Sequence, residues 1–199
     1  MVPESKEYWD SQWDPPEGTT EAQPTPEPEI FTAEDLLSAD IPPPAWVVSG
    51  LLPEGLTLFA ARPKIGKSWM SLNIAVCVTH SEKVFGSMES ECGDVFYLAL
   101  EDQKRRLKSR YEQMTATMGH KGAGRFSMAL SAPRLSQGGE EFIEKWVKNA
   151  DNPRLVIVDT VGKMRPRRGK SDDQYADTYD DMGLLKDLAD DLGIGVLGI

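Results

Sequence analysis

Residues 61–68 read Ala61-Arg62-Pro63-Lys64-Ile65-Gly66-Lys67-Ser68, and this run predicts a phosphate-binding loop. In such a loop the backbone N–H groups surround the phosphates of a nucleoside triphosphate. We expect Lys67 to reach the β and γ oxygens, Ser68 to ligate Mg²⁺, and Trp69 to contact the nucleotide as well. The motif therefore predicts ATP as the ligand and Mg²⁺ as the cofactor. Ala61 replaces the first glycine of the motif, which costs about 1 kcal/mol if that position needs a positive φ.

The flanks of this loop have the expected character. A short apolar strand is predicted over 56–60, directly after Gly55. A helix is predicted from Lys67 to about His80, and it is apolar nearly all round, as in helices buried against a sheet. The start of that helix adds partial positive charge where the phosphates would lie.

Strands and helices alternate through the rest of the chain. Further strands are predicted over 94–100, 125–130, 155–158 and 194–199, and further helices over 103–118, 140–150 and 175–192. We expect each of the strands to be apolar on both faces, which indicates a parallel sheet covered by helices on both sides. The predicted fold class is α/β, of the P-loop NTPase type.

Two acidic residues follow predicted strands, at the sheet edge where ligands of α/β proteins bind. Asp159 closes a strand of four apolar residues, and we expect it to ligate Mg²⁺ together with Ser68. Hydrolysis also needs a base that orients water. Because Thr160, not a second carboxylate, follows Asp159, we assign the base to Glu101, which we expect to be desolvated at the tip of its strand.

Two neighbours of Glu101 have open roles. Asp102 is either the N-cap of the next helix or a contact to the adenine amino group. Arg110 either stacks its guanidinium on the adenine ring or faces solvent.

A basic segment follows the Asp159 strand. Its five cations are Lys163, Arg165, Arg167, Arg168 and Lys170. A flexible loop of this kind suits the phosphates of single-stranded DNA, although it has no aromatic residue to stack bases. The alternative is a solvated loop that the aspartates downstream neutralise. Both interpretations stay open at this point.

The net charge of −10 is confined to one end of the chain. Residues 1–40 hold eleven Asp and Glu and a single Lys6, and the rest balances 21 basic against 21 acidic residues. Residues 1–30 are also rich in proline, so we predict a disordered tail there and one folded domain over 31–199. Trp9 and Trp13 suggest, as an alternative, a short partner-binding element in that tail.

Cellular location follows from two further features. Cys77 and Cys92 are isolated, and their spacing predicts neither a disulfide framework nor a metal site. The sequence has no apolar run of membrane-spanning length and no signal-peptide pattern at its N-terminus. We expect a cytoplasmic protein that does not contact membranes.

From about Phe31 to Ile199 the chain resembles the RecA-like, RepA-type ATPases of plasmids and phages, which are relatives of the hexameric replicative helicases. The resemblance is carried by the phosphate loop, by Tyr97-Leu-Ala-Leu-Glu101-Asp102 and by Leu155-Val-Ile-Val-Asp159-Thr160. It implies that Glu101 is the catalytic base, that the basic segment faces a channel for single-stranded DNA, and that the complete family form is a homo-hexamer acting in DNA replication.

The resemblance also implies further segments beyond the fifth strand, where this sequence stops at Ile199. We therefore expect this chain by itself to be mostly monomeric or weakly associated, to bind ATP, and to hydrolyse it slowly with little stimulation by DNA. The predicted function is that of an ATP-hydrolysing helicase motor domain. A nucleotide-binding regulatory module acting through the acidic tail is the alternative, and a P-loop kinase is disfavoured because Glu101-Asp102 and the basic segment suit water activation and polymer binding better.

Overall fold

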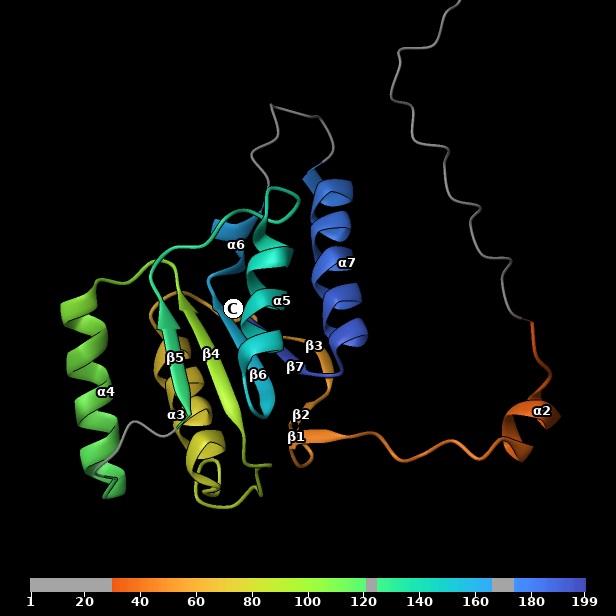
Figure 1. Cartoon of the computed structure of the whole chain (residues 1–199), viewed down its shortest axis with the longest axis horizontal. Helices are drawn as coiled ribbons and strands as arrows, with labels where there is room; N and C mark the ends of the chain where they lie inside the picture. The colour runs from red at the N-terminus through yellow and green to blue at the C-terminus, as the bar shows by residue number, and fades with distance from the viewer. Residues whose placement is uncertain (1–29, 121–124, 166–173) are drawn as a thin grey trace, which may run out of the picture. The chain divides into compact units, whose positions relative to one another are not determined.

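The structure is a computed structural model, and it describes residues 30–120, 125–165 and 174–199 (Figure 1). In the last of these segments it describes side chains from Asp181 onward. The predicted disorder of residues 1–30 lies, except for Ile30, outside the described residues. No helix in the described segments is both long enough and apolar enough to cross a membrane.

The chain divides into two units, Met1–Pro42 and Pro43–Ile199. The described part of the first unit holds the helix α2 (Ala33–Ser38). Thr32 caps this helix with two reciprocal hydrogen bonds. The Asp35 N–H donates to the Thr32 hydroxyl oxygen at 3.1 Å, and the Thr32 N–H donates to the Asp35 carboxylate at 2.9 Å. The domain boundary that the sequence suggests near residue 30 stays a prediction.

The second unit is built on five parallel strands in the order β3-β7-β6-β4-β5. Their bounds are β3 Gly55–Leu58, β4 Asp94–Ala99, β5 Phe126–Ala129, β6 Pro153–Asp159 and β7 Gly195–Gly198. The predicted strands are confirmed within two residues at every end, and the parallel sheet is confirmed. The prediction that each strand is apolar on both faces is wrong for the edge strand β5, where Ser127 and Met128 are exposed. β7 lies between β3 and β6, so the last strand completes the centre of the sheet.

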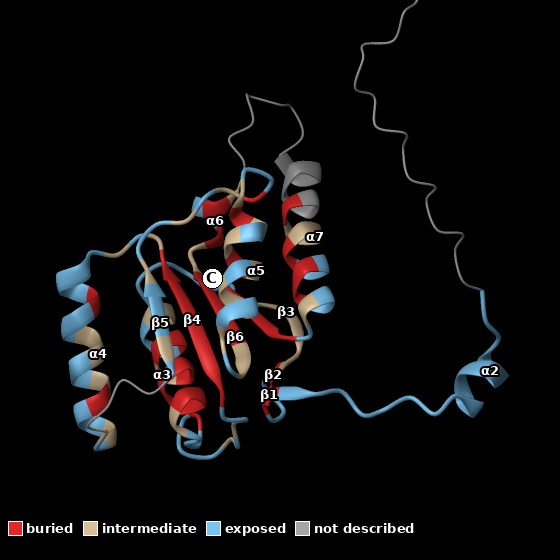
Figure 2. Ribbon diagram, in the orientation of Figure 1, coloured by how far each residue is buried: buried red, intermediate tan, exposed pale blue. Residues whose placement is uncertain are grey.

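Helices cover both faces of the sheet, as predicted (Figure 1). One face packs against α3 (Lys67–His80) and α4 (Lys104–Met118), and the other against α5 (Gly139–Asn149), α6 (Val161–Met164) and α7 (Gln174–Leu192). Alternate residues of β4 serve the two faces: Tyr97 faces the first layer, and Phe96 and Leu98 the second. Figure 2 shows that β4 is buried along its whole length.

Three elements of the second unit, β1 (Trp46–Val48), β2 (Leu52–Pro53) and α6, have no counterpart among the predicted ones. The antiparallel pair of β1 and β2 packs on the α3 face of the sheet. The short helix α6 begins directly after β6, so Lys163 lies in a helix and not in a flexible loop.

Two glycines in β7 allow β1 and α6 to approach this strand closely. A Cβ atom at Gly195 would lie 2.7 Å from Val47 of β1, and one at Gly198 would lie 2.8 Å from Val161 of α6. The prediction that α3 is buried nearly all round is wrong at its start, where Trp69 and Met70 are exposed.

Candidate nucleotide-binding site

The predicted phosphate loop connects β3 to α3. Gly66 caps α3 in the left-handed region at φ 101°, and Lys64 is the other loop residue with a positive φ, 67°. Ala61 does not have a positive φ, so the backbone strain considered for an alanine at the first glycine position of the motif does not arise. The Lys67 ammonium donates to the carbonyl oxygens of Ala61 at 2.8 Å and Arg62 at 3.3 Å, which places it inside the curve of the loop.

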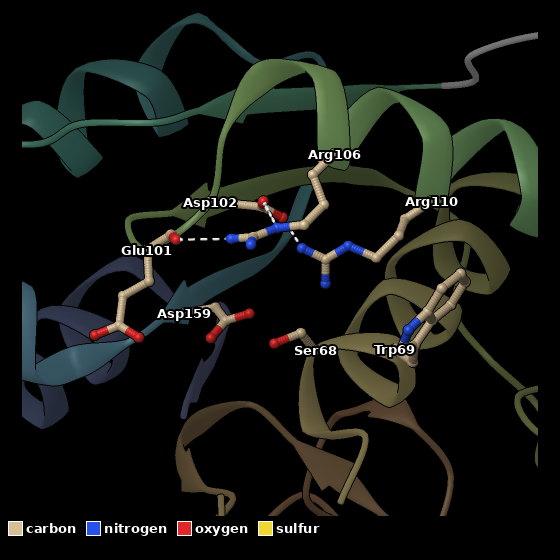
Figure 3. Close-up of a pocket in the computed structure, with 7 residues that line it drawn as sticks. All are labelled: Ser68, Trp69, Glu101, Asp102, Arg106, Arg110 and Asp159. Atoms are coloured by element: carbon tan, nitrogen blue, oxygen red, sulfur yellow. Dashed lines mark hydrogen bonds and ion pairs between the residues drawn. The ribbon is translucent and has the colours of Figure 1, made fainter. Parts of the chain in front are cut away.

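A pocket of about 330 Å³ begins where the loop meets α3 (Figure 3). Its lining residues come from the start of α3, the turn after β4, the first turns of α4 and the end of β6: Ser68, Trp69, Glu101, Asp102, Arg106, Arg110 and Asp159. Three features that are far apart in the sequence therefore meet, namely the end of the phosphate loop, Glu101 and Asp159. This is the carboxyl edge of a parallel sheet, where α/β folds bind ligands.

Asp159 is held by a buried tyrosine. The Tyr97 hydroxyl donates to Oδ2 of Asp159 at 2.8 Å, and the Ser71 hydroxyl lies 3.0 Å from the Tyr97 oxygen. Tyr97 is 1% exposed. Burial raises the pKa of its hydroxyl far above the usual value, and the negative charge of Asp159 adds to the increase, so the hydroxyl stays protonated.

Sequence reasoning missed both Tyr97 and Ser71 as members of the site. A signal was present, since each is a hydroxyl-bearing residue within an apolar run of its element. It could not identify the partners, because those depend on how β4, β6 and α3 pack together.

The donors at this edge fit Mg²⁺. Figure 3 shows the Asp159 carboxylate between Glu101 and Ser68, and none of the described residues donates a hydrogen bond to its Oδ1. A hydroxyl and a carboxylate are hard oxygen ligands, and Mg²⁺ commonly takes only one or two from the protein and the remainder from phosphates and water. In keeping with this, the described residues contain no cluster of three or more His, Cys, Asp or Glu side chains suited to a metal ion.

Glu101 lies in the pocket but is not desolvated, so that part of the prediction is wrong. β4 ends at Ala99, and Glu101 belongs to the exposed turn that follows. The backbone of this turn is fixed, because Leu100 N–H donates to the Asp159 carbonyl at 2.6 Å and the Arg106 guanidinium donates to the Glu101 carbonyl at 3.0 Å. No described residue hydrogen-bonds the Glu101 carboxylate, so the side chain can turn toward a substrate.

The buried carboxylate of Asp102 pairs with two arginines, the exposed Arg106 and the partly buried Arg110. The Asp102 side chain is 6% exposed, Arg106 Nε donates to Oδ1 at 2.5 Å, and Arg110 pairs with Oδ2. The predicted N-cap role is wrong, since Gln103 is the N-cap of α4 and Asp102 accepts the Gln103 N–H at 2.7 Å. The solvent-facing interpretation of Arg110 is also wrong, because its side chain is 18% exposed and lines the pocket.

We expect Asp102→Asn to destabilise the fold and weaken nucleotide binding together. The substitution leaves the partly buried Arg110 guanidinium without its counter-charge, which we expect to cost about 2–3 kcal/mol and to lower Tm by roughly 5–10 °C. Thermal melting and nucleotide titration measure the two effects. Glu112→Gln is the control, because it removes the exposed Glu112–Lys108 pair from the same helix and should change stability by less than about 0.5 kcal/mol. A variant as stable as the parent would show that the Asp102 pairs contribute little.

Of the two described cations of the basic segment, Lys163 is exposed and Arg165 contacts other elements. Arg165 Nε donates to Oδ2 of Asp181 on α7 at 2.9 Å, and the Asp181 side chain is 3% exposed. Arg134 also donates to the Arg165 carbonyl. At Arg165 the structure thus favours neutralisation by a downstream aspartate over a DNA contact. Neither Lys163 nor Arg165 lines the pocket, and Arg167, Arg168 and Lys170 lie outside the described residues.

Comparison with known proteins gives a family and a fold. A family model described as an AAA domain matches residues 22–198. None of the curated proteins compared with the chain matches it. Among solved structures, one described as an ATPase domain superposes with a TM-score of 0.53 at 15% identity over 73% of this chain and 56% of that one. A DnaB-like replicative helicase, described with its interactions with primase, superposes with a TM-score of 0.53 at 17% identity over 83% and 45%. The chain thus spans about half the length of these structures, and the likeness shows a shared fold.

Proposed function

The chain belongs to the AAA domain family, and we propose that it binds ATP with Mg²⁺ and hydrolyses it as the RecA-like motor domain of a plasmid or phage replicative helicase acting on single-stranded DNA. One observation carries the proposal: Ser68, Asp159 and Glu101 line the same pocket at the carboxyl edge of the sheet (Figure 3).

The residues of the site have different proposed roles. The loop 61–68 and the start of α3 offer backbone N–H groups to the phosphates, and Lys67 adds a cation at the β and γ oxygens. Ser68 and Asp159 would hold Mg²⁺, which when bound neutralises charge on those oxygens. Glu101 orients a water toward the γ-phosphorus and accepts its proton as the new P–O bond forms and the bond to the β–γ bridging oxygen breaks.

Trp69 and Arg110 are the proposed contacts to the nucleoside. Both side chains line the pocket, Trp69 from the start of α3 and Arg110 from α4 (Figure 3). A flat indole and a flat guanidinium favour a base that stacks. The proposed stacking of Arg110 on adenine is supported by its pairing with Asp102, because the pairing fixes where the guanidinium lies.

The test of the helicase-type function is ATP turnover measured with and without single-stranded DNA. We expect slow, Mg²⁺-dependent turnover that DNA stimulates only weakly, together with DNA binding that weakens steeply with salt. If Arg167, Arg168 and Lys170 contact phosphates, replacing all three with glutamine should reduce the slope of log K against log salt by about 2. The matched control replaces three exposed cations of α4, Lys104, Arg105 and Lys108, and should leave the slope unchanged.

Two outcomes would redirect the proposal. Nucleotide binding without turnover, in the presence or absence of DNA, would favour the regulatory module. Turnover that depends on a small hydroxyl acceptor and not on DNA would favour a kinase.

A further inference from the structure

Two buried hydroxyls lie between the two proposed Mg²⁺ ligands. The Tyr97 hydroxyl donates to the Asp159 carboxylate at 2.8 Å, and the Ser71 hydroxyl of α3 lies 3.0 Å from the Tyr97 oxygen and 3.2 Å from the backbone carbonyl of Ser68. Tyr97 and Ser71 are both buried. Their hydroxyls therefore lie away from solvent.

The number of hydroxyl hydrogens determines which of these groups donates to which. A carboxylate only accepts, so the single hydrogen of Tyr97 goes to Asp159. The single hydrogen of Ser71 then serves the Tyr97 oxygen or the Ser68 carbonyl, both of which lie within its reach. In either arrangement the Asp159 oxygen Oδ2 is engaged, and Oδ1 is the oxygen to which no described residue donates a hydrogen bond.

Packing alone does not explain a tyrosine at this position. Its ring lies against Phe126, edge to face, with ring centroids 6.2 Å apart, and a phenylalanine would make the same contact. Burying the extra hydroxyl is costly unless it is hydrogen-bonded. The hydroxyl is bonded, and its acceptor is the carboxylate that the site needs to hold still.

We propose that Tyr97 is a positioning residue for the metal site: through Ser71 it fixes the Asp159 carboxylate relative to the first turn of α3, so that Oδ1 and the Ser68 hydroxyl form a prearranged pair of Mg²⁺ ligands. This proposal rests on the proposed function, because it assigns a role within the same nucleotide site.

The experiment uses the full chain and separates metal binding from nucleotide binding. A fluorescent, non-hydrolysable ATP analogue is titrated first in EDTA, and Mg²⁺ is then titrated into the saturated complex. We expect Tyr97→Phe to keep the affinity measured in EDTA within about twofold, and to weaken the apparent Mg²⁺ affinity by about tenfold, since one engaged carboxylate hydrogen bond is lost. Ser71→Ala should have a smaller effect of the same kind.

A double-mutant cycle shows whether Tyr97 acts through Asp159. In an Asp159→Asn background, Tyr97→Phe should cause no further loss of Mg²⁺ affinity, because the group that it positions is already altered. The control is Thr79→Val, which removes another buried hydroxyl of α3, bonded at 3.0 Å to the Val76 carbonyl. It should leave the Mg²⁺ titration unchanged.

The outcomes distinguish the two proposals. A parent protein that fails to bind the analogue with and without Mg²⁺ overturns the proposed function and this inference with it. A parent that binds, together with a Tyr97→Phe variant of parental Mg²⁺ affinity, overturns only the inference. Two other results for Tyr97→Phe also overturn the inference. One is an equal loss of affinity for the analogue in EDTA and in Mg²⁺, and the other is a lower melting temperature with no change in binding. In both cases the hydroxyl has only a structural role. If Tyr97→Phe does not fold, Ser71→Ala decides by the same criteria.

Discussion

Replacing Lys67 with alanine is expected to raise the Kd for ATP by about a hundredfold or more. The reason is that the ammonium makes charge-assisted hydrogen bonds to two phosphate oxygens, worth about 1.5–3 kcal/mol each. In the structure it already lies within the loop, bonded to the carbonyls of Ala61 and Arg62, so little reorganisation is needed to reach a phosphate. Equilibrium titration with a fluorescent ATP analogue measures the effect, and circular dichroism checks that the variant is folded.

The matched control removes a different cation from the same loop. Lys64 is exposed and adopts a φ of 67°, a conformation that glycine takes without strain. Lys64→Gly should therefore weaken binding by less than about tenfold, through long-range charge alone. Equal losses in the two variants would mean that the loop attracts phosphates only by its summed charge, and the specific role of Lys67 would be withdrawn.

The fold was predictable because its signals are local. Gly66 and Lys67 mark the junction of a strand and a helix, and the predicted α3 is found at Lys67–His80. Runs of apolar residues such as Leu155–Val158 fill both faces of a parallel strand, so they stand out in the sequence. β1 and β2 were missed because they are short and gain their stability from packing on the sheet.

The site was predictable only as far as topology determines it. Parallel strands bring their carboxyl ends to one edge, so Glu101 and Asp159 could be expected to meet the phosphate loop. Burial at that edge could not be predicted: β4 ends at Ala99, just short of the expected end, and this leaves Glu101 in an exposed turn. The pairs Asp102–Arg110 and Tyr97–Asp159 depend on the rotation of a helix and the offset of two strands, which the sequence pattern does not contain.

Glu101 and Asp159 show how two carboxylates in one pocket can have different roles. Asp159 is partly buried and hydrogen-bonded by Tyr97, so its orientation is set before a substrate arrives. Glu101 is exposed, and its carboxylate has no hydrogen bond to a described residue. A fixed carboxylate suits a metal ligand, whereas a carboxylate with no partner in the protein is available to accept a hydrogen bond from the attacking water. The two environments therefore support the base at Glu101 even though the predicted desolvation is absent.

Replacing Glu101 with glutamine should slow ATP turnover by about 10²–10⁴-fold and leave the Kd for ATP within about twofold of the parent. Glutamine keeps the size of the side chain but cannot accept the proton of the attacking water. Single-turnover hydrolysis measures the chemical step, and the analogue titration measures binding. Glu91→Gln, an exposed substitution in the loop before β4, is the control and should change neither quantity. Parental turnover in Glu101→Gln would remove Glu101 as the base, and the search would then move to another group able to reach the pocket, since Asp159 is held in place by Tyr97.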